Sequence, residues 1–272
     1  MTYRIHITSS GPRTGTTLLT EVFKNCFNID CSCNHEASIA NSTSSFGKCN
    51  TVLTKNPSET KHLNKILNYV NNLYIICIIR DPRDMVVSYH GLDREKYFCG
   101  LNFWFDFLED YQKLKNHPRF VLISYEDFTK NPDKVQRHIQ KKIPFLKHQF
   151  NFSEYHLHAK PDENTLRALN ELRPIESKGV GNWKKHKSRI KQQIVKHGNI
   201  TDGLLHFNYE LNRSWEKNLD NIETKDFISY LPENKDNKLA KKVFLLALFN
   251  FTCEKLYLNP DKIYKRFKKI KG

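Results

Sequence analysis

Seven apolar residues in a row, from Leu73 to Ile79, restrict the fold of this chain more than any other feature. A strand that faces water on one side alternates apolar and polar residues, whereas a strand covered on both faces is apolar throughout. The run therefore predicts a strand at the centre of a parallel sheet. Other strand-like runs alternate with segments of helical spacing along the chain. The strand-like runs are residues 5–8, 51–54 and 120–124, and the helical segments are residues 16–26, 58–70, 101–115 and 132–141. The sequence thus predicts an α/β fold, an open parallel sheet flanked by helices.

Local signals set the expected ends of the helices. Ser58 is expected to cap the helix that runs to Val70. A short helix is expected from Met85 to about His90, after the break at residues 80–84. Asn131 is expected to cap a helix whose first turn holds Pro132.

The composition is that of a globular protein with an anionic partner. Apolar residues make up 39% and charged residues 27% of the 272-residue chain, which excludes a disordered class. The formal net charge of +15 favours a nucleotide, a nucleic acid, an acidic glycan or a membrane surface as a partner.

The cysteines and the apolar runs indicate a soluble, cytoplasmic protein. Seven scattered cysteines cannot all pair, and we expect reduced thiols. The N-terminus leads directly into a strand-like run rather than into a signal peptide. No apolar run approaches the ~20 residues that span a bilayer.

The chain divides near Trp215 by composition. Residues 1–215 hold the alternating strands and helices. Residues 216–272 are polar, then contain an amphipathic helix near 242–256, and end in a basic tail. We expect one α/β domain, 1–215, and a helical, basic C-terminal extension, 216–272.

The loop after the first strand is suited to bind an anion. Residues 11–17, Gly-Pro-Arg-Thr-Gly-Thr-Thr, lie between a strand and a helix, where backbone N–H groups and the helix dipole attract negative charge. The loop differs from a Walker A motif, because Thr16 stands where that motif has its lysine. Its basic residue, Arg13, comes earlier.

A second anion site is predicted at Arg80 and Ser88. Arg80 follows the apolar strand, at the edge where open α/β sheets bind ligands. Ser88 comes eight residues later, so that an arginine and a hydroxyl suit a phosphate. The alternative is an arginine that only pairs with Asp84. Two phosphate sites on one sheet edge imply a nucleotide with phosphates at both ends.

These motifs resemble those of the sulfotransferase family. Residues 11–19 look like its 5'-phosphosulfate loop, and residues 80–89 look like its 3'-phosphate motif. Residues 125–128, followed by Asn131-Pro132, resemble the segment whose tyrosine lies near the adenine. Residues 178–184 resemble the loop that closes over the 3'-phosphate, although Asn182 replaces Asp and the two glycines are one residue closer.

The resemblance implies a fold, a donor and a set of donor-binding residues. The fold is expected to be like that of P-loop nucleoside triphosphate hydrolases. The donor is expected to be 3'-phosphoadenosine-5'-phosphosulfate (PAPS), with no metal. The residues implied to bind it are Arg13, Thr14, Gly15, Thr16, Thr17, Arg80, Ser88, Tyr125, Lys178 and Gly179.

The resemblance also suggests which residues carry out sulfuryl transfer. The reaction is an in-line displacement, in which charge grows on the leaving phosphate oxygen and the acceptor loses a proton. Arg13 and Lys55 are candidates to neutralise that charge, unless Lys55 is a plain surface lysine. Asn56 and Pro57 occupy the place of the histidine that serves as base in cytosolic relatives. Tyrosylprotein and glycan relatives use a Glu after the first helix, and Glu36 fits that place, so the resemblance implies Glu36 as the base, with His35 as the second choice.

Other functions fit the sequence less well. A zinc site at residues 31–35 is disfavoured, because its spacing is too tight for the usual ligand pairs and no second pair follows. A nucleotide kinase of the same broad fold is the first alternative, and it lacks the Walker lysine. A basic nucleic-acid-binding protein is the second, and no helix-turn-helix, RNP or KH signature is present.

The expected acceptor is a hydroxyl on a carbohydrate or a protein tyrosine, although a small molecule remains open. The lysine-rich run 184–191 is either a solvated helix face or a rim for an anionic acceptor. The basic C-terminus suggests contact with a membrane surface, and no nucleic-acid partner is expected.

Overall fold

The described residues form one open, five-stranded parallel sheet, as predicted. The computed structural model describes residues 2–33, 36–42, 49–89, 93, 95–233, 237–256, 258–260 and 263. The strand order is β2-β3-β1-β4-β5, and neighbouring strands run parallel. The strands are β1 (Tyr3–Ser9), β2 (Cys31–Ser32), β3 (Thr51–Lys55), β4 (Leu73–Ile79) and β5 (Phe120–Ser124).

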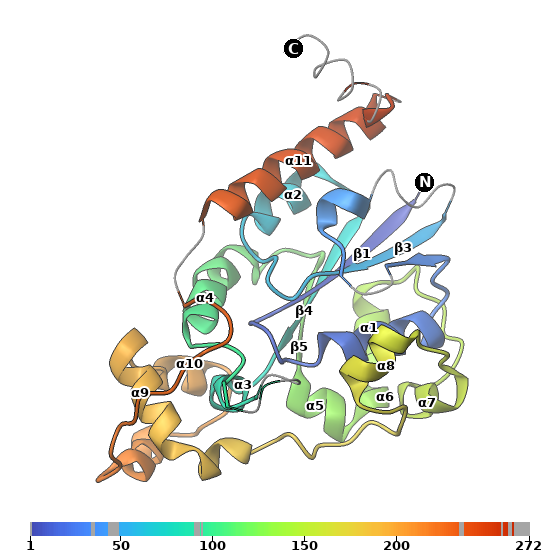
Figure 1. The fold of residues 1–272 in the computed structure, drawn as a ribbon. Coiled ribbons are helices and arrows are strands. Elements are labelled where there is room, and N and C mark those ends of the chain that lie inside the picture. The colour runs from blue at the N-terminus through green and yellow to red at the C-terminus, as the bar shows by residue number, and fades with distance from the viewer. Residues whose placement is uncertain are drawn as a thin grey trace.

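Helices cover both faces of this sheet (Figure 1). The α-helices are α1 (Thr16–Cys26), α2 (Leu63–Tyr69), α3 (Pro82–Val86), α4 (Asn102–Leu114), α5 (Tyr125–Lys130), α6 (Pro132–Lys142), α7 (Tyr155–His158), α8 (Glu163–Leu169), α9 (Lys187–His197), α10 (Thr201–His206) and α11 (Asn237–Lys255). The 3-10 helices are η1 (Ile39–Ser42), η2 (Phe152–Glu154), η3 (Asn182–Lys185) and η4 (Arg213–Leu219).

The strand β4 contributes side chains to two separate cores. Ile75, Cys77 and Ile79 pack in the core beside α2, α4, α9 and α11. Ile76 and Ile78 point the other way, into the core beside α1, α5 and α6. Successive side chains of a strand point to opposite faces, so the continuous apolar run of β4 fits a strand that is buried between two helical layers.

Two expected helices have other boundaries in the structure. The helix expected from Ser58 begins at Leu63, because His62 adopts the left-handed conformation, with φ 66°, directly before it. The helix expected over residues 85–90 is α3, which begins earlier and ends at Val86. Asp81 caps it by accepting a hydrogen bond from the Arg83 N–H, and Pro82 stands at its first position, where a missing N–H costs nothing.

The C-terminal helix α11 packs on the α/β domain beside α2 and η1 (Figure 1). Arg4 of β1 pairs with Glu254 at 2.5 Å, and the Asn250 amide donates to the Ala40 carbonyl at 2.7 Å. Within the described ranges, no helix is both long and apolar enough to cross a bilayer.

Candidate active site

The predicted site residues follow four neighbouring strands at their carboxyl ends. Lys55 is the last residue of β3, the anion loop follows β1, Arg80 follows β4, and Tyr125 follows β5. These strands are adjacent in the order β3-β1-β4-β5. The four motifs therefore lie side by side along the edge where open parallel sheets bind ligands.

The loop between β1 and α1 contains three residues with positive φ. Gly11 has φ 150°, Arg13 has φ 66° and Gly15 has φ 88°. The Thr14 hydroxyl donates to the Gly11 carbonyl at 2.9 Å, which closes the turn. A Cβ atom at Gly15 would lie 2.8 Å from the ring of Tyr125, so glycine is required for the loop to approach β5.

Arg80 connects three of the predicted motifs. Its Nη1 donates to the Arg13 carbonyl at 2.7 Å, and its Nη2 donates to the Gly179 carbonyl at 2.5 Å. Its guanidinium lies 4.6 Å from the ring centroid of Tyr125. The side chain is buried, with 8% of the residue exposed, and its Nε has no hydrogen-bond partner among the described residues. A buried, unpartnered cationic donor is the group that an anion would satisfy.

Arg13 and Arg80 place two positive charges close together. Desolvation and, next, the charge of Arg80 lower the pKa of Arg13. The Arg13 guanidinium also lies 5.6 Å from the ring centroid of Phe98. The mutual repulsion of two cations is relieved when an anion binds between them.

Ser88 and Arg80 both line the same cavity. Ser88 follows α3 rather than belonging to it. Its hydroxyl donates to the Asp84 carbonyl oxygen at 3.0 Å. The hydroxyl oxygen retains lone pairs, and rotation of the O–H would let it donate to a ligand instead.

Asp84 has a role that the sequence did not suggest. Its carboxylate accepts hydrogen bonds from the N–H groups of Gly181, at 2.6 Å, and Trp183, at 2.8 Å. Burial raises the pKa of Asp84, and the two backbone donors oppose this rise. Asp84 thus anchors the loop that contains Lys178 and Gly179, instead of forming the simple ion pair with Arg80 that was the alternative. The motif Arg80–Asp84 was visible in the sequence, but its backbone partners lie about a hundred residues away.

The Lys178 side chain is 79% exposed and pairs with Glu176 at 2.8 Å. Gly179 lies against Arg80 and Tyr125, since a Cβ there would be 2.9 Å from Arg80 and 3.3 Å from the Tyr125 hydroxyl. Of the two residues, only Gly179 contacts the other motifs directly.

A cavity of about 770 Å³ lies between these motifs, large enough for a nucleotide. Its wall includes Arg13, Arg80, Ser88, Tyr125 and Gly179. The other basic residues that line it are Arg167, Arg173, Lys178, Lys185 and His186. Its acidic lining residues are Asp84 and Glu176, so the cavity is strongly cationic.

Lys55 and Glu36 lie at the β3 end of this sheet edge, beside the anion loop. Lys55 is buried, and its Nζ is 3.4 Å from the Thr17 hydroxyl and 3.4 Å from Glu36 Oε1. Burial lowers the pKa of Lys55, and the Glu36 carboxylate opposes this. Lys55 is therefore no plain surface lysine. Glu36 is 45% exposed at its side chain, so an acceptor can reach it.

Two further predicted residues are Thr16 and His35. Thr16 is buried in the first turn of α1, where its carbonyl accepts a hydrogen bond from the Thr20 hydroxyl. His35, the second choice for the base, lies outside the described residues.

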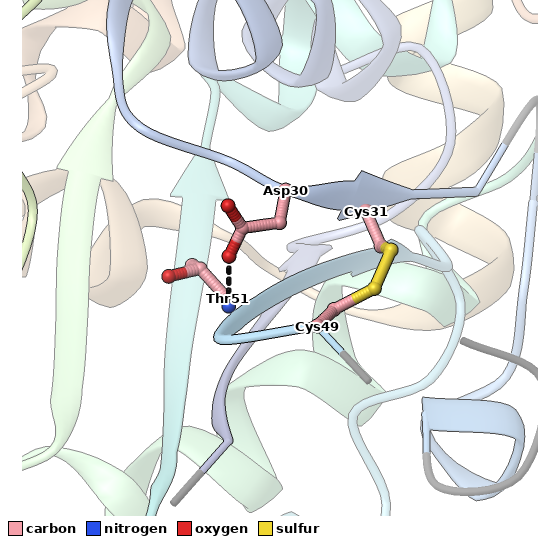
Figure 2. The surroundings of a disulfide bond; sticks show 4 residues. All are labelled: Asp30, Cys31, Cys49 and Thr51. Carbon is pink, nitrogen blue, oxygen red and sulfur yellow. Dashed lines mark hydrogen bonds between the residues drawn. A yellow bond between two sulfur atoms is a disulfide. The ribbon is translucent and has the colours of Figure 1, made fainter. Parts of the chain in front are cut away.

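The expectation that all cysteines are reduced is wrong. Cys31 and Cys49 form a disulfide (Figure 2). The other five cysteines are thiols. Beside the disulfide, the Thr51 N–H donates to the Asp30 carboxylate at 2.7 Å. Spacing alone could not find this pair, because the sulfur atoms meet only when β2 aligns beside β3.

Comparisons with known proteins complete the description of the site. Residues 31–144 match the profile of the sulfotransferase family. No curated protein sequence matches the chain. The mouse sulfotransferase SULT7A1, complexed with PAP, is 15% identical with a TM-score of 0.47, and the alignment covers 75% of this chain and 89% of that one. The sulfotransferase domain of the Synechococcus PCC 7002 olefin synthase is 13% identical with a TM-score of 0.43, with 67% and 88% covered.

Proposed function

We propose that this chain, whose residues 31–144 match the sulfotransferase family, moves a sulfuryl group from PAPS to a hydroxyl group on a carbohydrate or a protein tyrosine. Sulfuryl transfer is the activity that the family has in common. The particular acceptor, and the residues that carry out each step, form the proposal.

The cluster around Arg80 is the observation that carries the proposal. Arg13, Arg80 and Ser88 line one cavity, and the Arg80 Nε is buried without a partner among the described residues. This arrangement supports a doubly phosphorylated adenosine that lies along the sheet edge. Its 3'-phosphate would lie at Arg80 and Ser88, and its adenine near Tyr125. Its phosphosulfate would lie at the loop of residues 11–17, where the helix dipole of α1 adds to the attraction.

The proposed chemistry takes place near the end of β3, around Lys55 and Glu36. Lys55 and Arg13 would donate hydrogen bonds to the leaving phosphate oxygen as its negative charge grows. Glu36 would take the proton from the acceptor hydroxyl while the oxygen attacks sulfur and the sulfur–oxygen bond to the phosphate breaks. The 3.4 Å contact between Lys55 and Glu36 supports this pairing of roles, because it puts the base beside the leaving group's partner.

The proposal is tested by binding and then by turnover. Calorimetry with adenosine 3',5'-bisphosphate (PAP) should give a dissociation constant that Arg80→Ala weakens by at least about 10-fold, as expected for the loss of a charge-assisted contact. Arg137→Ala, on the exposed side of α6, is the matched control and should leave the constant unchanged. Equal affinity of the Arg80→Ala variant would contradict the assignment of the 3'-phosphate.

Turnover is tested with labelled PAPS and a panel of glycans, tyrosine peptides and small alcohols. Transfer to one class identifies the acceptor. ATP turnover without sulfate transfer would instead support a nucleotide kinase. Salt-sensitive binding to DNA or RNA, without affinity for PAP, would support a nucleic-acid-binding protein.

Three expectations from the sequence stay predictions. They are the domain division at residue 215, the contact of the basic C-terminus with a membrane surface, and the cytoplasmic location. The Cys31–Cys49 disulfide removes one argument for that location, since disulfides are rare in the cytosol.

A further inference from the structure

The segment that contains Glu36 is attached to the sheet through a buried carboxylate, Glu59. The Ser38 hydroxyl donates to Glu59 Oε1 at 2.7 Å, and the Ile39 N–H donates to Glu59 Oε2 at 2.9 Å. Glu59 lies in the connection between β3 and α2 and is only 9% exposed. One side chain thus holds two consecutive residues that come closely after Glu36.

Glu59 is itself fixed from β1. The Thr8 hydroxyl donates to the Glu59 carbonyl at 3.1 Å, and His6 Nε2 lies 3.4 Å from Glu59 Oε2. His6 is fully buried, its Nδ1 contacts the Thr54 hydroxyl at 2.9 Å, and burial lowers its pKa to about 3. His6 Nε2 has no hydrogen-bond partner among the described residues, and the two Glu59 oxygens accept their hydrogen bonds from Ser38 and Ile39.

The backbone of the segment is fixed beside Lys55. The Ala37 N–H donates to the Lys55 carbonyl at 2.9 Å. The residue before Ala37 is Glu36, and the residue after it is held by Glu59. The position of the Glu36 carboxylate relative to the Lys55 ammonium therefore depends on contacts at Ala37, Ser38 and Ile39.

We propose that Glu59 is a positioning residue for sulfuryl transfer, which holds the Glu36 segment so that its carboxylate reaches the acceptor hydroxyl beside Lys55. This inference rests on the proposed function. Glu59 makes no contact with the cavity that the donor is proposed to occupy. Its loss should impair the chemical step and leave donor binding intact.

The test compares two variants of Glu59 in the full chain. Glu59→Ala removes both acceptors and should lower kcat by about 10²-fold, the effect of displacing a catalytic group by about 1 Å. The dissociation constant for PAP should change by less than about twofold, which means that donor binding is retained. Glu59→Gln keeps one oxygen for the Ile39 N–H and offers an amide N–H to the Ser38 hydroxyl, so it should recover most of the lost turnover.

A control separates this role from a general loss of stability. Glu109→Ala removes an exposed carboxylate, paired with Lys113, from α4. It should change neither kcat nor PAP affinity. If Glu59→Ala does not fold, Ser38→Ala removes one of the two contacts and should give a smaller fall in kcat with PAP affinity unchanged.

Hydrogen exchange gives a readout that does not depend on activity. In Glu59→Ala the Ile39 amide should exchange at least about tenfold faster, because its acceptor is gone, while amides of β4 keep their protection. If the wild-type chain binds PAP but transfers no sulfate, the proposed function is refuted. Faster exchange of the Ile39 amide in Glu59→Ala would in that case still show that Glu59 holds the segment. Unchanged kcat in Glu59→Ala, or a fall in PAP affinity as large as the fall in kcat, would refute the positioning role.

Discussion

Lys55 shows at the level of one residue how the site combines burial with charge. It is almost fully buried, yet its ammonium group is 3.4 Å from both the Glu36 carboxylate and the Thr17 hydroxyl. A buried ammonium without such partners would be expensive to desolvate. Its contacts reach both the anion loop and the proposed base. A substitution in the loop should therefore affect the position of the base, and the reverse.

Glu36→Gln is expected to lower turnover by ~10²–10⁴-fold, because a neutral amide cannot take the proton from the acceptor. PAP binding should survive, since Glu36 does not line the cationic cavity. Labelled-sulfate transfer and calorimetry on the same preparation check the two parts. Wild-type turnover in this variant would exclude Glu36 as the base, and His35 would then be the residue to change.

Gly15→Ala is expected to destabilise the protein by about 1–3 kcal/mol from its left-handed backbone alone. The contact of the new Cβ with the Tyr125 ring, at 2.8 Å, adds to this. Gly181→Ala is the matched control, because Gly181 has φ 80° but no atom within 4 Å of the added Cβ. Urea unfolding should show a larger loss at Gly15 than at Gly181. Equal losses would mean that the loop can move away from Tyr125.

Among the elements, the central strands were predictable and the short connecting elements were not. The run that forms β4 is apolar throughout because both faces of the sheet are covered there, and β1, β3 and β5 hold apolar residues such as Ile5, Leu53 and Val121 at buried positions. These patterns are local in the sequence. The start of α2 depends on the left-handed His62, and β2 has only two residues. Such features are decided by tertiary contacts rather than by periodicity.

The same division applies to the site. The placement of Arg13, Arg80 and Tyr125 at one sheet edge could be predicted, because Arg80 and Tyr125 directly follow predicted strands and Arg13 lies in the loop after the first one. The roles of Asp84 and Glu59 could not, because each depends on backbone N–H groups that are far away or in an irregular segment. Local sequence identifies the residues at the end of a strand, but not the distant backbone that a carboxylate will hold.

Reduction of the Cys31–Cys49 disulfide is expected to lower the free energy of unfolding. The cysteines are 18 residues apart, and closing a loop of that size is worth about 3 kcal/mol in the chain-entropy model. Urea unfolding with and without a dithiol reductant measures the loss, and Cys31→Ser should reproduce it. An unchanged midpoint, with alkylation of all seven thiols after unfolding without a reductant, would contradict the bond.

For the whole molecule, part of the positive charge lies where the motifs meet. The net charge of +15 includes the basic residues around the 770 Å³ cavity. Cationic walls raise the local concentration of an anionic ligand and speed its association, and salt weakens the effect. The two cores on either side of β4 keep these charges on a rigid edge.

PAP is therefore expected to stabilise the entire chain. A ligand that binds only the folded state at 100 times its dissociation constant adds about 2.7 kcal/mol to the free energy of unfolding. A rise in Tm with PAP concentration checks this, and the rise should shrink in Arg80→Ala. Adenosine, which lacks both phosphates, is the control. A similar rise with adenosine would mean that the phosphates contribute little.

The loop of residues 179–183 is attached at both Arg80 and Asp84, and this sets the stage at which the loop loses its conformational entropy. Arg80 holds the Gly179 carbonyl, and Asp84 holds the N–H groups two and four residues further on. The loop is thus ordered when the chain folds, so a ligand arriving at the sheet edge need not immobilise it again. Pre-organisation of this kind makes affinity less dependent on the length of the loop and more dependent on the contact that the unpartnered Arg80 Nε offers to an anion.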